Sequence, residues 1–133
     1  MKVKILPSKT SGEVSAPPSK SFAHRYLIGS VLSRGKCVIK NIADSDDISA
    51  TLSCIEQLGG SVTKDGNIVT VIPTNEKQIE NAVFDCKESG STLRFFIPVV
   101  LATGAKNCTF LGSERLLARG IKEYEKLFEN SDV

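Results

Sequence analysis

The sequence lacks every short motif that would mark a metal, redox or nucleotide site. Its four cysteines lie far apart without a C-x-x-C pair, which argues against a zinc site or a redox centre. Neither G-x-x-x-x-G-K-[ST] nor G-x-G-x-x-G occurs, so no nucleotide phosphate loop is indicated. The longest apolar run, residues 95–102, is far shorter than the ~20 residues of a membrane span. We therefore expect no metal and no membrane partner.

An excess of charge of one sign is also absent. Seventeen Lys and Arg face fifteen Asp and Glu, the net charge is +2, and aromatic residues make up only 6%. This balance speaks against a nucleic-acid partner, so any anion site must be local. The first residues are polar and contain no apolar signal segment, so we expect a reduced, cytoplasmic protein. We expect its cysteines to be small core residues: Cys37, Cys54, Cys86 and Cys108.

The chain has 133 residues, 41% of them hydrophobic, which is enough for one ordinary domain or a piece of a larger one. Its first half predicts two short strands at "KVKILP" and "GEVSAP", followed by a helix over residues 19–34. A strand at "KCVIKNI" and a helix over "DSDDISATLSCIEQLGG" come next. The Asp65-Gly66 pair between two β-prone runs then predicts a hairpin.

The second half repeats this order in part. It predicts a strand at "NAVFDC", a helix at "STLRFFIPVVLATG", a strand at "NCTFLG" and a helix at "RLLARGIKEYEKLFEN". The pattern favours an α/β (α+β) fold made of βαβαββ units, one complete and one partial. A single complete α/β domain is the alternative.

A cluster of polar side chains opens the first predicted helix, in "APPSKSFAHR". Lys20, Ser21 and Arg25 fall on one face of its first two turns. The free N–H groups and positive dipole end of a helix favour an anion, and the cations add to this. In the competing interpretation, Ser19 only caps the helix and the cations are solvated. For the single histidine, His24, a packed or exposed role is expected rather than metal binding or catalysis.

Three further stretches carry polar side chains. In "ESGST", Gly90 permits close backbone approach at the start of an apolar helix, although such a stretch is more often only a capped loop. In "DSDDIS", Asp44 or Ser45 is expected to cap a helix while Asp46 and Asp47 face its positive dipole, in preference to a metal site. In "GSERLLAR", Arg115 and Arg119 are four residues apart and share one face of a helix that has begun by Arg115.

Taken together, "PPSKSFAHR", "SDD", "ESGSTLR" and "GSERLLAR", in this order and spacing, resemble the N-terminal part of the 5-enolpyruvylshikimate-3-phosphate synthase family. The resemblance runs over essentially the whole chain. It implies a fold of two lobes built from βαβαββ repeats of the enolpyruvyl transferase type, with the active site between them. It also implies transfer of the enolpyruvyl group of phosphoenolpyruvate to shikimate 3-phosphate, without a metal or organic cofactor.

The same resemblance assigns substrate contacts. Lys20 would contact both substrates, and Ser21 and Arg25 would hold shikimate 3-phosphate. Gly90 would present its backbone to phosphoenolpyruvate, and Arg119 would bind that substrate's anionic groups. The family's acid and base residues belong to a later part of the chain. We therefore expect no catalytic residue here and a fragment that is inactive by itself.

The resemblance also implies an arrangement of parts. Residues 1–13 would form a strand segment that joins the second lobe, and residues 14–133 a truncated N-terminal lobe. The full-length enzyme is expected to be monomeric, while the inter-lobe surface of a fragment leaves self-association open. Three positions, Lys87, Glu88 and Gly120, differ from residues that are common in the family, so Glu88 receives no ligand role.

Other functions remain as alternatives. A UDP-N-acetylglucosamine enolpyruvyl transferase has the same fold, but it favours Asn after the lysine, where this chain has Ser21. RNA 3'-terminal phosphate cyclases share the repeat, yet the charge and the few aromatic residues speak against a nucleic-acid groove. A phosphate-binding module without catalytic activity is the third possibility.

Overall fold

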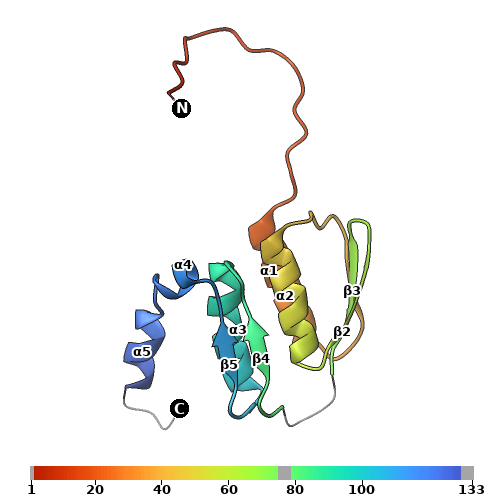
Figure 1. Cartoon of the computed structure of the whole chain (residues 1–133). Helices are drawn as coiled ribbons and strands as arrows, with labels where there is room; N and C mark the ends of the chain where they lie inside the picture. The colour runs from red at the N-terminus through yellow and green to blue at the C-terminus, as the bar shows by residue number, and fades with distance from the viewer. Residues whose placement is uncertain (1, 75–78, 130–133) are drawn as a thin grey trace.

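A computed structural model describes residues 2–74 and 79–129 and has both helices and strands, as expected (Figure 1). Two separate sheets accompany a group of three longer helices. In chain order the elements are α1 (Lys20–Val31), β1 (Cys37–Ile39), α2 (Asp46–Gln57), β2 (Ser61–Asp65), β3 (Ile68–Ile72), β4 (Val83–Asp85), α3 (Gly90–Ala102), β5 (Thr109–Leu111), α4 (Glu114–Leu117) and α5 (Lys122–Phe128).

The strands form an antiparallel sheet of three and a parallel pair. In the first sheet the order is β1-β3-β2, and the hairpin of β2 and β3 closes with Asp65 paired to Ile68. Gly66 takes a positive φ of 55° in this turn, which confirms the hairpin predicted from the Asp-Gly pair. Strands β4 and β5 run parallel, and α3 is the crossover between them.

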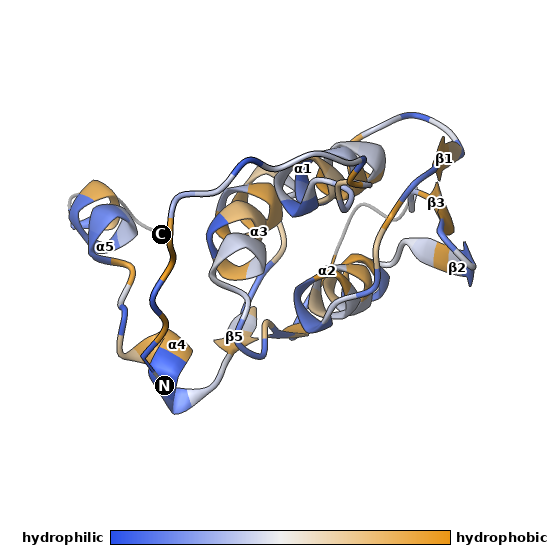
Figure 2. Ribbon diagram, turned by 90° about the horizontal axis from the view of Figure 1, so that it is seen from above, coloured by the Kyte–Doolittle hydropathy of each residue, from blue (hydrophilic) through white to orange (hydrophobic). Residues whose placement is uncertain are grey.

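Helices α1, α2 and α3 pack side by side and enclose the core (Figures 1 and 2). Leu27 of α1, Ile55 of α2 and Phe96 of α3 are all 0% exposed, and so is Phe84 of β4. The ring of Phe84 lies 5.1 Å from that of Phe110, between the centroids. Burial of these apolar side chains is the main favourable term that holds the helices together, because each removes a large apolar area from water.

A serine caps the N-terminus of each of these three helices. Ser19, Ser45 and Ser89 adopt extended backbone angles, and each side chain accepts the backbone N–H of the residue three positions later. Asp46 and Asp47 occupy the first turn of α2, where their charge complements the helix dipole. The predicted capping role of "DSDDIS" is therefore confirmed.

The two strands predicted at "KVKILP" and "GEVSAP" are wrong. Residues 2–19 contain no strand, and Figure 1 shows the segment before residue 17 extending away from the helices. Their apolar side chains are exposed, with Ile5 at 88% and Val14 at 93%. A strand needs a neighbour that accepts and donates its backbone hydrogen bonds, and in the described part of the chain these residues have no neighbouring strand.

The single helix predicted near the C-terminus is also wrong. Its residues form two short helices, α4 and α5, and Gly120 between them has a positive φ of 65°. The amide of Arg119 bonds to the carbonyl of Leu116, and that of Gly120 to Leu117, so the chain turns there. Asn130, the last residue of the predicted helix, lies outside the described residues. A glycine in a left-handed conformation ends a helix because it has no Cβ to clash.

The remaining expectations concern cysteines and membranes. All four cysteines are free; Cys54 and Cys86 are buried, whereas Cys37 and Cys108 are half-buried. The predicted core role is thus confirmed for two of them. Among the helices that the structure describes, none is long and apolar enough to cross a membrane.

Candidate functional site

A polar pocket of about 400 Å³ lies at the N-terminus of α3. Three arginines and two carboxylates face it, together with a glycine and a serine. They come from the first turn of α2, from the start of α3 and from the α4 region. The lining residues are Asp47, Glu88, Gly90, Ser91, Arg94, Arg115 and Arg119.

Gly90 forms the floor of this pocket, and two guanidinium groups lie directly over it. A Cβ added to Gly90 would stand 2.9 Å from Nη1 of Arg94 and 3.7 Å from Nη1 of Arg119. Arg94 donates to the carbonyl of Gly90 across one helical turn, at 3.5 Å. The absence of a side chain at position 90 is therefore what allows both arginines to approach the backbone of α3.

The start of α3 supplies further donors to the same space. Ser89 caps the helix by accepting from the amide of Thr92 at 3.2 Å. The N–H groups of the helix's first residues, Gly90 and Ser91, have no intrahelical acceptor, because no earlier turn exists. These amides, the positive dipole end and two guanidinium groups together favour an anion such as a phosphate or a carboxylate.

Arg115 is the third arginine of the pocket, and it faces a carboxylate. Its Nη1 lies 3.6 Å from Oε1 of Glu88, and both side chains are more than half exposed. An exposed pair of this kind contributes at most about 1 kcal/mol, so it restricts Arg115 only weakly. Glu88 thus lowers the positive charge of the pocket without closing it.

Lys20 reaches the edge of the pocket through Asp47. Its Nζ lies 2.9 Å from Oδ2 of Asp47, in a pair whose side chains are 53% and 34% exposed. Asp47 is itself a lining residue, so the structure brings Lys20 to within one ion pair of the Gly90 region. The pair is partly exposed and can exchange partners at small cost.

The structure places Ser21 and Arg25 elsewhere on α1. Arg25 stacks on Phe95 of α3, with its guanidinium carbon 5.3 Å from the ring centroid. Its Nη1 also donates to the carbonyl of Ser21 at 2.9 Å. Both residues are exposed. Of the five residues singled out from the sequence, the structure therefore gathers Gly90 and Arg119, and adds Lys20 through Asp47.

Two lining residues were missed at the level of sequence. Arg94 follows Gly90 by four positions, and this spacing alone could have placed it over the glycine on one helix face. Asp47 was interpreted only as a helix-capping charge, and no local pattern indicated that it would face α3. Its place depends on how α2 and α3 pack.

His24 lies beneath this region rather than in the pocket. Its side chain is 1% exposed, and Nδ1 lies 2.8 Å from Oγ1 of Thr51 on α2. Burial lowers the pKa of His24 below its ordinary value of 6.5, because the charged ring would lose its hydration. The packed role expected from the sequence is confirmed.

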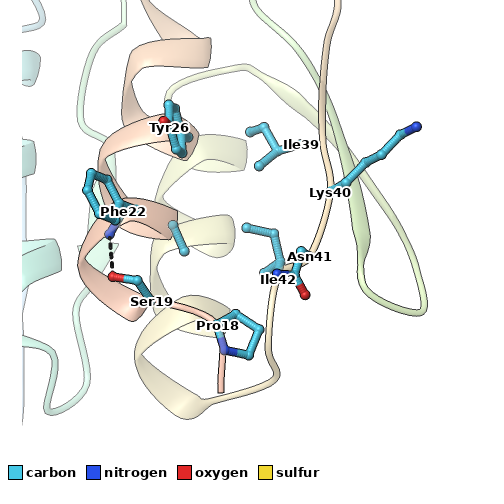
Figure 3. Close-up of a pocket in the computed structure, with 9 residues that line it drawn as sticks. Pro18, Ser19, Phe22, Tyr26, Ile39, Lys40, Asn41 and Ile42 are labelled. Carbon is cyan, nitrogen blue, oxygen red and sulfur yellow. Dashed lines mark hydrogen bonds between the residues drawn. The ribbon is translucent and has the colours of Figure 1, made fainter. Parts of the chain in front are cut away.

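Two other hollows are less suited to an anion. One, of about 270 Å³, is lined mainly by apolar side chains that include Phe22, Tyr26 and Ile39. Figure 3 shows that Lys40 points away from this hollow. The other, of about 670 Å³, is an apolar groove between α3, β5 and α5. No group of three or more His, Cys, Asp or Glu residues in the described ranges could hold a metal.

Comparison with known proteins gives one consistent family. The family model of EPSP synthase (3-phosphoshikimate 1-carboxyvinyltransferase) matches residues 6–133. Proteins named 3-phosphoshikimate 1-carboxyvinyltransferase are similar to this chain in Clostridioides difficile (strain 630), at 42% identity over 142 residues, and in Clostridium novyi (strain NT), at 39% over 140. Each alignment covers 98% of this chain and 32% of the relative. The chain thus spans about a third of the length of these relatives.

We predict that Gly90→Ala weakens anion binding. The new Cβ would displace the guanidinium of Arg94, whose approach is 2.9 Å, and loss of one charge-assisted contact should weaken inorganic phosphate binding about tenfold or more. The free energy of unfolding should change little, because Gly90 has an ordinary helical conformation.

Titration with inorganic phosphate, followed by NMR, measures this effect. Gly29→Ala on α1 is the matched control, because its Cβ would meet nothing within 4 Å. Equal phosphate affinity in Gly90→Ala and the wild-type chain would contradict the assigned geometry.

Proposed function

Since this chain belongs to the EPSP synthase family, we propose that it supplies the phosphoenolpyruvate side of an enolpyruvyl transfer site. The reaction moves the enolpyruvyl group of phosphoenolpyruvate to the 5-hydroxyl of shikimate 3-phosphate and releases phosphate. The observation that carries the proposal is the position of Arg94 and Arg119 over Gly90 at the start of α3. A small ligand with one phosphate and one carboxylate matches this set of donors.

The roles follow from the contacts in the pocket. The backbone amides at Gly90 and Ser91 would bind one anionic group of phosphoenolpyruvate, as they do not bond within the helix. Arg119 would bind the second group; it is exposed and has a free path to a ligand. Arg94 is half-buried and anchored to the carbonyl of Gly90, so it would contribute a fixed charge.

Lys20, Ser21 and Arg25 are proposed to serve the second substrate as well. Lys20 would contact both substrates, exchanging part of its pairing with Asp47 for a ligand phosphate. Ser21 and Arg25 would hold shikimate 3-phosphate, and both are exposed at the N-terminal end of α1. Two polyanions bound side by side repel each other, so cations between them lower the energy of the complex.

We also propose a place for this chain in the larger fold. The order α1, β1, α2, β2, β3 fits a βαβαββ repeat that lacks its first strand, and β4, α3, β5, α4 fits part of a second. The first strand of the full repeat, at "GEVSAP", would form only beside a further strand. Residues 1–13 would join the second lobe and residues 14–133 form a truncated N-terminal lobe. The complete enzyme would be cytoplasmic and monomeric.

We predict that the chain binds phosphoenolpyruvate and that Arg119→Ala weakens this binding about tenfold or more, because a charge-assisted contact is lost. Titration calorimetry with phosphoenolpyruvate measures the effect. Arg34→Ala removes the same charge from an exposed position at the far end of α1 and should bind like the wild type.

Shikimate 3-phosphate should also bind. Tighter binding of UDP-N-acetylglucosamine or single-stranded RNA would favour the competing functions instead.

A second prediction concerns turnover. Purified 133-residue chain, given phosphoenolpyruvate and shikimate 3-phosphate, should release no phosphate above the rate without protein. The physical reason is that the arginines of the pocket do not give up a proton, and its two carboxylates are both engaged by cations: Asp47 pairs with Lys20 and Glu88 with Arg115. A phosphate-release assay measures this, and robust turnover by the isolated chain would show that a complete active site is present.

A further inference from the structure

A chain of buried side-chain hydrogen bonds runs beneath the pocket and links all three central helices. Nδ1 of His24 on α1 lies 2.8 Å from Oγ1 of Thr51 on α2. Oγ1 of Thr51 lies 2.8 Å from Oγ1 of Thr92 on α3, which in turn lies 2.7 Å from Oγ of Ser89. None of these four residues is more than 2% exposed. The chain ends at the residue that caps α3.

The last link of this chain of hydrogen bonds sets one direction for the hydrogens, because Oγ1 of Thr92 donates to Oγ of Ser89. Each threonine hydroxyl has a single hydrogen and also lies near the carbonyl of Asp47, at 3.1 Å from Thr51 and 3.4 Å from Thr92. In both cases the contact along the chain is the shorter one. Thr92 then donates to Ser89 and Thr51 donates to Thr92. The hydroxyl of Thr51 is thereby used as a donor, so Nδ1 of His24 must supply a hydrogen to Thr51.

The other ring nitrogen of His24 supports this direction. Nε2 is buried and has no hydrogen-bond partner within the described part of the molecule. In the Nδ1–H form of the ring, Nε2 carries only an unpaired acceptor, whereas the reverse direction would leave a buried N–H without an acceptor. Orphaned buried N–H groups are the rarer and costlier case.

We propose that His24, as its neutral Nδ1–H form, is a positioning residue for the anion pocket. Acting through Thr51 and Thr92, it would fix Ser89 and thereby aim the amides of Gly90 and Ser91 at the ligand. This inference rests on the proposed function of the pocket, because positioning matters there only if an anion binds. The side-chain oxygen of Ser89 accepts two hydrogen bonds from Thr92, one from the backbone N–H of Thr92 and one from its hydroxyl.

The charge state of His24 agrees with this role. Burial lowers its pKa, Lys20 and Arg25 on α1 lower it further, and Asp47 on α2 opposes them. The group of α3 that this series of hydrogen bonds reaches through Thr51 is the neutral hydroxyl of Thr92. At a pH above the pKa of His24 the ring keeps one N–H hydrogen, and in the proposed arrangement Nδ1 donates it to Thr51. A second hydrogen, on Nε2, would be buried without a partner.

The middle link tests the proposal, because Thr51 does not line the pocket. We expect Thr51→Val to bind phosphoenolpyruvate about fivefold more weakly, the cost of one lost hydrogen bond, and to shift the amide resonance of Gly90. Thr51→Ser restores the hydroxyl and should restore both. Thr103→Val is the matched control: it removes a hydroxyl that donates to a helix carbonyl at the other end of α3, at 2.7 Å, and should change neither.

The outcomes separate the two proposals. Wild-type affinity and an unshifted Gly90 amide in Thr51→Val would overturn the positioning role. If the wild-type chain does not bind phosphoenolpyruvate, the proposed function fails, and the Gly90 amide still decides whether His24 and Thr51 position the start of α3. If Thr51→Val does not fold, the positioning role is tested instead by the protonation state of His24 in the wild-type chain.

That state is measured by the ¹⁵N chemical shifts of the imidazole ring as pH is lowered. We expect hydrogen on Nδ1 and not on Nε2, and a pKa below 6.5. The unfolded chain then takes up the proton first, so the free energy of unfolding should be constant above about 6.5 and fall as pH drops below it. His24→Asn cannot titrate and should lose this fall. Hydrogen on Nε2, or a pKa of 6.5 or higher, would overturn the proposal.

Discussion

Three helix N-termini meet at one end of this molecule, and each carries a partial positive charge. Lys20 opens α1, Asp47 lies in the first turn of α2, and Gly90 opens α3. Seen along the helices, the three lie side by side (Figure 2). Like partial charges at close range raise the energy of the fold unless negative charge or hydrogen-bond acceptors compensate them. Asp46 and Asp47 in the first turn of α2 and Glu88 just before α3 supply part of this compensation, and the space at Gly90 is available to an anion from outside.

The groups that would bind an anion here are of two kinds, fixed backbone donors and mobile arginine side chains. The backbone at Gly90 is held by the cap at Ser89 and by buried hydroxyls, so its direction is determined before a ligand arrives. Arg119 and Arg115 are exposed, and a weak pair with Glu88 restrains Arg115. Fixed donors provide specificity because they need no reorganisation, whereas long cationic side chains adapt to the ligand at an entropic cost.

Much of the fold could be predicted from local pattern. Ser19 predicted where α1 begins, "DSDDIS" predicted the start of α2, and the Asp65-Gly66 pair predicted the hairpin. In these cases the deciding contacts lie within about four residues, so a short window contains the cause. The prediction of two N-terminal strands was wrong because a strand forms only beside a second strand that pairs with its backbone. The prediction of one continuous last helix was wrong because a helical sequence pattern can contain a glycine. In the folded chain Gly120 has a positive φ, which ends α4 before α5 begins.

The sequence by itself determined the chemical inventory of this protein: a near-neutral chain with a capped glycine start at Gly90 and arginines at helical spacing around it. Tertiary structure decided which of these groups meet. It turned Arg25 onto Phe95, brought Asp47 to the Gly90 pocket, and joined His24 to Thr51 across 27 positions of the chain. Such contacts exist only after three helices have packed, because the loss of chain entropy that they require is offset by burial of the shared core.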